Sequence, residues 1–406
     1  MVMKRKLVIT KLDNKIVSAL YENGEAAELH CTKKQDASAF ELGNIYIGKV
    51  KNIVGNISAA FIEIAKGVEC YYAIPENNAP IFTHKVGKKP ISVGDELLVQ
   101  ISKEAVKTKV PTVTSKLSFT GKYCVLTSGD TRIGASLKLE KEERERLLQI
   151  AKKYSSEKYG LIMRTNAKDI SETVLRAEVE HLICEYEKLV SAAQMRVCFS
   201  CLKMAPQSYL TDLKNVPQEG LQEIVVEDAE LFKETKSYLE TYQPEDLEKL
   251  RLYEDKMLPL HKLYNLEKQI EKALKERVWM KSGAYLVIQM TEALTVIDVN
   301  TGKCIDKKND DKAYLKINKE AAKEAAKQIR LRNLTGIILI DFINLSSKNL
   351  TAELMDYFER ELKKDPIATT LVDITKLQLV EVTRKKIRKP FHEAFCESVD
   401  KKITIS

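Results

Sequence analysis

Apolar and polar residues alternate in short runs through the first part of the chain and recur at helical spacing in much of the rest. Residues 1–35 predict short strands, with Asn23-Gly24 as the turn of a hairpin. The alternation continues through 40–120, where about five short strands predict a small barrel. The beginning of the chain is therefore predicted to be β-structure.

From residue 121 onward, strands mix with amphipathic helices. In chain order the predicted elements are a strand at 122–126, helix 141–154, strand 160–164, helix 172–191, a short strand at 225–226, helix 263–277, strands 284–290 and 294–299, helix 318–332, strand 336–343, helix 348–363 and strands near 369–374 and 378–382. The last of these alternate as in an α/β layer, which places ligands at strand ends. The predicted fold class is mixed α/β and multidomain, with an inserted β-barrel.

Two of the predicted strands each carry one aspartate in an otherwise apolar run. Asp298 lies in TVIDVN and Asp341 in IILIDF. Burying a lone carboxylate is costly unless a charge or a metal compensates it, so two at matching points of two core-like strands suggest a shared cation. Oxygen ligands of this kind suit Mg²⁺. The alternative is that each aspartate ends its strand and caps the next turn, and the pattern does not separate the two.

Composition narrows the class of protein. The chain has 406 residues, 44% of them hydrophobic, and a formal net charge of +8. This length predicts about two to four modules. Basic residues cluster at 103–116, 330–332 and 384–389, which would suit attraction of a nucleic-acid backbone, although such runs are commonly solvated faces. No apolar run is long enough to predict a signal peptide or a membrane span.

The eight cysteines are scattered along the chain, and only Cys198 and Cys201 are closely spaced. Because no second close pair accompanies them, a reduced, cytoplasmic protein is predicted. We interpret this pair as two incidental thiols, with a zinc site between two chains as the alternative.

Several runs resemble the ribonuclease E/G family. LGNIYIGKV and AAFIEI, at 42–50 and 59–64, are similar to the start of an S1 RNA-binding domain. Four later runs resemble the catalytic half of the family in the same order and at similar spacing: VWMKSGAY, TEALTVIDVNTG, QIRLRNL and IDFI. The resemblance covers nearly the whole chain.

The resemblance implies an RNase H-like subdomain interrupted by the S1 (OB-fold) barrel, then a 5′-sensor region and a DNase I-like catalytic domain. The domains predicted on this basis are 1–37 (RNase H-like, first part), 38–120 (S1), 121–210 (5′ sensor), 211–278 (RNase H-like, return), 279–396 (catalytic) and 397–406 (tail).

The resemblance also implies an activity and its residues. Asp298 and Asp341 match the family's magnesium ligands, and Asn300 matches an asparagine that orients the metal or the scissile phosphate. Hydrolysis of phosphodiester bonds in single-stranded RNA is implied, in rRNA and mRNA processing and decay. Glu292 belongs to the same run but fits a structural hydrogen bond equally well, so it is not included.

Two RNA-binding sets are implied. The S1 set stacks bases on Phe61 and Tyr71 and holds the backbone with Lys103 and Lys109; on the residues alone, barrel core is the alternative for Phe61.

The 5′-sensor set favours 5′-monophosphorylated substrates and consists of Arg164, Thr165, Val125 and Lys138. Leu137 departs from the family, which commonly has arginine there, and Lys138 is expected to compensate in part.

Other departures concern assembly. The family's CPxC zinc motif has no counterpart here, which puts a zinc-linked tetramer in doubt and leaves a homodimer open. No degradosome scaffold tail is expected after 397–406. Two alternatives remain: an RNA-binding or ribosome-maturation factor with reduced cleavage activity, and a metal-dependent DNA nuclease.

Overall fold

The computed structural model describes residues 3–33, 40–103, 110–302 and 311–396. The chain divides into two compact units: residues 1–34 with 208–406, and residues 35–207. The second unit is thus inserted in the first. The predicted mixed α/β fold with an inserted barrel is confirmed at this level.

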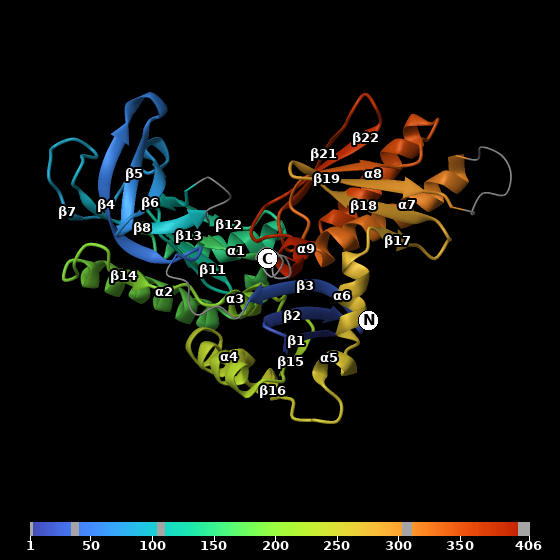
Figure 1. Cartoon of the computed structure of the whole chain (residues 1–406), viewed down its shortest axis with the longest axis horizontal. Coiled ribbons are helices and arrows are strands. Elements are labelled where there is room, and N and C mark those ends of the chain that lie inside the picture. The colour runs from blue at the N-terminus through green and yellow to red at the C-terminus, as the bar shows by residue number, and fades with distance from the viewer. Residues whose placement is uncertain (1–2, 34–39, 104–109, 303–310, 397–406) are drawn as a thin grey trace, which may run out of the picture. The chain divides into compact units, whose positions relative to one another are not determined.

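The first unit contains a five-stranded sheet in the order β16-β15-β1-β2-β3 (Figure 1). Its strands are β1 (Arg5–Leu12), β2 (Lys15–Glu22), β3 (Glu25–Lys33), β15 (Leu221–Val226) and β16 (Leu250–Leu252). β1 to β3 form an antiparallel meander, and β15 and β16 add to β1 in parallel. Asn23 and Gly24 both have positive φ, 50° and 85°, so the predicted hairpin turn is confirmed.

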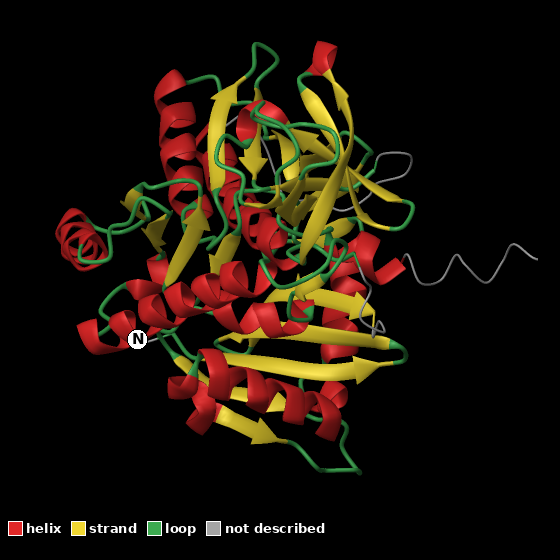
Figure 2. Cartoon of the chain, turned by 90° about the vertical axis from the view of Figure 1, so that its left-hand side faces the viewer, coloured by secondary structure: helices red, strands yellow, loops and turns green. Residues whose placement is uncertain are grey.

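Helices lie on both faces of this sheet (Figure 2). Successive strand residues point to opposite faces, so Leu7 and Ile9 pack with α3 (Ser208–Asn215) and α4 (Ala229–Tyr242), while Val8 packs with α5 (Leu260–Leu263) and α6 (Leu266–Leu274).

The single helix predicted at 263–277 is wrong. Asn265, with φ 52°, separates α5 from α6 because left-handed backbone cannot continue a helix. The last residue of the predicted helix, Arg277, instead begins β17 (Arg277–Trp279).

A buried carboxylate joins the C-terminal part of the unit to this sheet. Asp212 of α3 is 3% exposed, accepts hydrogen bonds from Ser18 and Arg388, and lies 3.0 Å from Nδ1 of His30. Burial by itself raises the pKa of Asp212. The charges of Arg388 and His30, with the hydrogen bonds from His30 and Ser18, outweigh burial and hold the pKa well below its ordinary value.

We expect this cluster to make the unit acid-sensitive. Because the pKa of Asp212 is lowered on folding, its contribution is complete above the unfolded pKa of about 3.9 and is lost as the pH falls from there towards the folded pKa. Urea unfolding at a series of pH values should show a smaller loss of stability in acid for Asp212→Asn than for the wild type. Asp13→Asn, in an exposed turn, is the control and should behave as wild type. If the free energy of unfolding fell equally with pH in Asp212→Asn and in the wild type, the expectation would be contradicted.

The first unit also contains a six-stranded sheet in the order β17-β18-β19-β20-β22-β21 (Figure 1). Its further strands are β18 (Tyr285–Met290), β19 (Leu294–Asn300), β20 (Gly336–Asp341), β21 (Thr369–Ile374) and β22 (Leu379–Arg384). One face packs against α7 (Asp311–Leu331) and α8 (Lys348–Leu362) through a core that includes Ile297, Ile338 and Phe358. α7 is already helical at residue 311, earlier than the predicted start at 318.

The inserted unit begins with a barrel. β4 (Ile45–Val54), β5 (Ala59–Ala65), β6 (Val68–Ala73), β9 (Thr112–Thr114) and β8 (Glu96–Lys103) pair in this order, and pairing of β4 with β8 closes the circle. β7 (Phe82–His84) adds to β8, and β14 (Cys201–Lys203) adds to β4. This five-stranded barrel is consistent with the predicted S1 or OB fold.

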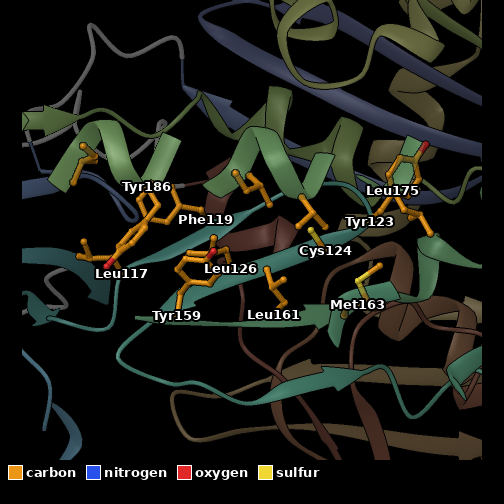
Figure 3. Close-up of a cluster of buried hydrophobic side chains, with 14 of the residues drawn as sticks. Leu117, Phe119, Tyr123, Cys124, Leu126, Tyr159, Leu161, Met163, Leu175 and Tyr186 are labelled. Carbon is orange, nitrogen blue, oxygen red and sulfur yellow. The ribbon is translucent and has the colours of Figure 1, made fainter. Parts of the chain in front are cut away.

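The rest of the inserted unit is a four-stranded sheet covered by helices. The sheet consists of β10 (Ser118–Thr120), β11 (Cys124–Ser128), β13 (Tyr159–Met163) and β12 (Ile133–Ala135). α1 (Lys141–Lys152) and α2 (Glu172–Ala193) pack on it through a buried cluster around Phe119, Tyr159 and Tyr186 (Figure 3). β10 thus pairs with β11 in this sheet, whereas β14, later in the chain, pairs with β4 of the barrel.

None of the helices in the described ranges is long and apolar enough to cross a membrane.

Candidate metal centre and nucleic-acid interface

Asp298 and Asp341 lie side by side on the six-stranded sheet. β19 and β20 are parallel neighbours, and the two aspartates are direct partners in their register. Ile297 and Val299 are buried against the helices, so Asp298 faces the other side of the sheet, which we call the open face. Asp298 is half-buried and Asp341, the last residue of β20, is exposed. The prediction that both are buried is thus wrong for Asp341, because this face is not the one that α7 and α8 cover.

The carboxylate of Asp298 affects the titration of Asp341. Partial burial and then the negative charge of Asp298 raise the pKa of Asp341. Within the described residues neither carboxylate forms an ion pair with a lysine or arginine, and Nδ2 of Asn300 donates a 2.7 Å hydrogen bond to Oδ2 of Asp298. Asn300 therefore orients Asp298.

This donor set fits a hard divalent cation. Mg²⁺ is usually bound by one or two carboxylates and keeps several water molecules. In the part of the chain that the structure describes, no group of three or more histidine, cysteine, aspartate or glutamate side chains could hold a metal. Asp298 and Asp341, which have no cationic partner among the described residues, are a two-carboxylate set of the kind that could hold such a cation.

A buried asparagine positions the chain just after Asp341. Asn318 of α7 is fully buried, donates to the carbonyl of Ile343 at 2.7 Å, and accepts from the amide of Ile343 at 3.0 Å. This double contact fixes the exit of β20. Sequence reasoning missed Asn318, although a polar residue on the apolar stripe of a helix is a usable signal.

The barrel brings its predicted RNA-binding residues into one row. Phe61 is the register partner of Tyr71, Tyr71 pairs with Thr112, and Thr112 pairs with Lys103. The Phe61 and Tyr71 rings meet edge to face, with centroids 6.3 Å apart. Both rings are half-buried and lie outside the barrel core, and Lys103 is exposed. Lys109 lies outside the described residues.

The predicted 5′-sensor residues also come together. Val125 on β11 is the register partner of Ile162 on β13. The side chain of Ile162 is 43% exposed, and Arg164, two residues after Ile162, lies on the same face. The hydroxyls of Thr165 and Ser136 are 2.9 Å apart, which brings the exposed Lys138 close to this edge. The side chain of Leu137 is 85% exposed.

A half-buried glutamate lies beside these residues and was missed from sequence. Glu178 accepts hydrogen bonds from the backbone amides of Lys122, Tyr123 and Cys124 at 2.8, 2.7 and 2.8 Å. Burial raises the pKa of Glu178, against the effect of these three bonds. Arg164 donates to the carbonyl of Gly121 at 2.7 Å, so the turn before β11 is held from both sides.

Three arginines of the predicted basic clusters serve the fold instead. Arg330 pairs with Glu22 and Glu28, and Arg332 is 5% exposed. Arg384 is 3% exposed and pairs with Asp365, with Nε and Oδ2 2.7 Å apart. These three guanidinium groups are therefore not part of a solvated basic face.

Cys198 and Cys201 are both free thiols. Burial is the main cause that raises the pKa of Cys198, to about 11, so this thiol is protonated at neutral pH.

Comparison with known proteins identifies the family. The Ribonuclease E/G family model matches residues 118–387. Ribonuclease G of Escherichia coli (strain K12) is 29% identical over 408 residues, which cover 97% of this chain and 82% of that protein. Ribonuclease G of Haemophilus influenzae is 30% identical over 403 residues, with the same coverage. Ribonuclease E of a Synechocystis strain is 31% identical over 366 residues, 87% of this chain and 54% of that protein. The chain therefore belongs to the ribonuclease E/G family of endoribonucleases.

Proposed function

We propose that this chain is a Mg²⁺-dependent endoribonuclease that hydrolyses phosphodiester bonds in single-stranded RNA during rRNA and mRNA processing and decay. The observation that carries the proposal is the register pair of Asp298 and Asp341, with Asn300 bonded to Asp298. We assign the six-stranded sheet to a DNase I-like catalytic domain, the five-stranded sheet to an RNase H-like subdomain and the barrel to an S1 domain. The scattered cysteines agree with action in the cytoplasm.

In this proposal Asp298 and Asp341 hold the cation. When bound, Mg²⁺ supplies a Lewis acid for the phosphoryl oxygen and lowers the pKa of an attacking water. Asn300 keeps the Asp298 carboxylate in position through its amide hydrogen bond. Asn318 keeps the chain that follows Asp341 in place.

The row on the barrel supports binding of single strands. Phe61→Ala combined with Tyr71→Ala should weaken RNA affinity, because each stacked base contributes about 1–3 kcal/mol. Fluorescence anisotropy of a labelled single-stranded RNA measures the change. Val86→Ala, which removes a 60% exposed apolar side chain elsewhere in the barrel unit, is the control. Unchanged affinity in a folded double variant would show that these rings do not stack on RNA.

A cleavage assay tests the function itself. We expect the wild type to cleave AU-rich single-stranded RNA with Mg²⁺ present and to stop when EDTA is added. We also expect RNA with a 5′-monophosphate to be cleaved faster than the same RNA with a 5′-hydroxyl. The reason is that Arg164 and Thr165, which suit a phosphate, lie beside Val125 at one edge of the sheet. Equal rates would indicate that the chain with Leu137 does not sense the 5′ end. Cleavage of a matching DNA but not of the RNA would contradict the proposal.

A further inference from the structure

An exposed tryptophan lies on the open face near the carboxylates. Trp279 is the one tryptophan of the chain, and it is 63% exposed on β17, the edge strand of the sheet. Its register partner on β18 is Tyr285, and the partner of Tyr285 on β19 is Asn300. Residues that are register partners point to the same face of a sheet. The side chains of Trp279, Tyr285 and Asn300 therefore lie side by side on the open face.

The two rings are held together and flanked by a positive charge. The Trp279 and Tyr285 centroids are 4.9 Å apart, with 52° between the planes. The guanidinium carbon of Arg277 lies 4.6 Å from the Tyr285 centroid and 5.9 Å from that of Trp279. A cation over aromatic rings stabilises their arrangement. We refer to the two rings of Trp279 and Tyr285, together with the Arg277 guanidinium group beside them, as the aromatic row.

The position of the aromatic row relative to the candidate metal ligands is set by the sheet. One strand spacing, about 4.8 Å, separates the backbone of Tyr285 from that of Asn300, and Trp279 is one spacing further. Arg277 pairs with Val287, which is in turn the partner of Asp298. The aromatic row thus adjoins the carboxylates on the open face, since Arg277 is two strands from Asp298 in the same register.

We propose that the aromatic row is a stacking site for a base of the RNA strand, next to the phosphate that is cleaved at Asp298 and Asp341. This inference rests on the proposed function, which brings that phosphate to the carboxylates. Trp279 offers an exposed ring face to the base, Tyr285 supports it from the side, and Arg277 contacts the phosphate backbone. Aromatic platforms with a nearby cation are the usual chemistry of single-strand binding.

The single tryptophan makes binding directly observable, because all tryptophan emission comes from Trp279. We would titrate the Asp341→Asn chain, in which cleavage should be slow enough for a binding measurement, with 5′-monophosphorylated AU-rich single-stranded RNA and Mg²⁺. Stacking should quench and shift the emission in step with RNA binding measured by anisotropy. RNA that binds fully without changing the emission would overturn the stacking site and leave the proposed function standing.

Cleavage by aromatic variants gives the second readout. Trp279→Leu and Tyr285→Leu should each lower kcat/KM by about tenfold, within the range for one stacked base, and Trp279→Phe should recover most of the loss. Tyr357→Leu is the matched control, because the Tyr357 ring also lies within 6 Å of two cations, Lys319 and Arg360, but stands on α8 behind the sheet.

The outcomes separate the two proposals. Equal loss in Trp279→Leu and Tyr357→Leu, or no rescue by Trp279→Phe, would contradict the stacking site while cleavage by the wild type remains. Absence of cleavage in the wild type and in every variant would instead contradict the proposed function. Thermal unfolding of the Trp279 variants should match the wild type, since Trp279 is mostly exposed and forms little of the core.

Discussion

Asp298→Asn and Asp341→Asn are each expected to lower RNA cleavage at least about a hundredfold, because each removes a negative charge from the pair that we propose holds the metal, and metal stabilisation of the transition state contributes several kcal/mol. The two aspartates are direct register partners. The combined variant should therefore lose little more activity than either single one, since both side chains serve one site.

A gel assay with single-stranded RNA at several Mg²⁺ concentrations measures this effect. Asp356→Asn is the control, because Asp356 is an exposed aspartate of α8. RNA binding by anisotropy should change little in the variants, since the candidate S1 contacts lie on the barrel. Wild-type activity in Asp298→Asn and Asp341→Asn would refute the proposed metal centre.

Arg384→Met is expected to destabilise the first unit by about 3–5 kcal/mol, because it leaves a buried carboxylate without its charge partner. The side chains of Arg384 and Asp365 are 2% and 5% exposed. Arg384 also donates to Oδ1 of Asn333 at 2.6 Å and to the carbonyl of Leu334 at 3.2 Å, so it holds the chain that enters β20.

Urea unfolding followed by circular dichroism measures the loss. Adding Asp365→Asn to Arg384→Met should recover part of the stability, because the unpaired charge disappears. Lys363→Met removes an exposed ion pair with Glu359 on the same domain and should change stability little. A loss in Arg384→Met as small as that in Lys363→Met would disprove the role of burial.

Local pattern was sufficient for most of the elements. Apolar patterning predicted most strands of the barrel and of both large sheets, although not β16 and β17. Asn23-Gly24 predicted its turn, because a two-residue turn with positive φ depends on neighbouring residues only. The helix predicted at 263–277 failed at Asn265, where apolar spacing continues through a residue with left-handed backbone. Periodicity records which positions are apolar and does not record where the backbone turns.

The candidate site depended on long-range pairing. Asp298 and Asp341 were recognisable in the sequence, but their adjacency follows from the parallel register of β19 and β20. Burial likewise depends on tertiary packing. In the sequence Arg384 belongs to a basic run, whereas in the structure it is buried against Asp365. A charged residue carries no local mark of whether a distant partner covers it.

The sequence by itself thus determined the mixed α/β class, the inserted barrel and a resemblance to a ribonuclease family, since these follow from local patterns and distinctive runs. Only the tertiary structure decided which face of the sheet remains open, that Asn300 orients Asp298, and that Trp279, Tyr285 and Asn300 share a row. The physical reason is that strand register and sheet order bring distant residues together, and neither is encoded in the spacing along one strand.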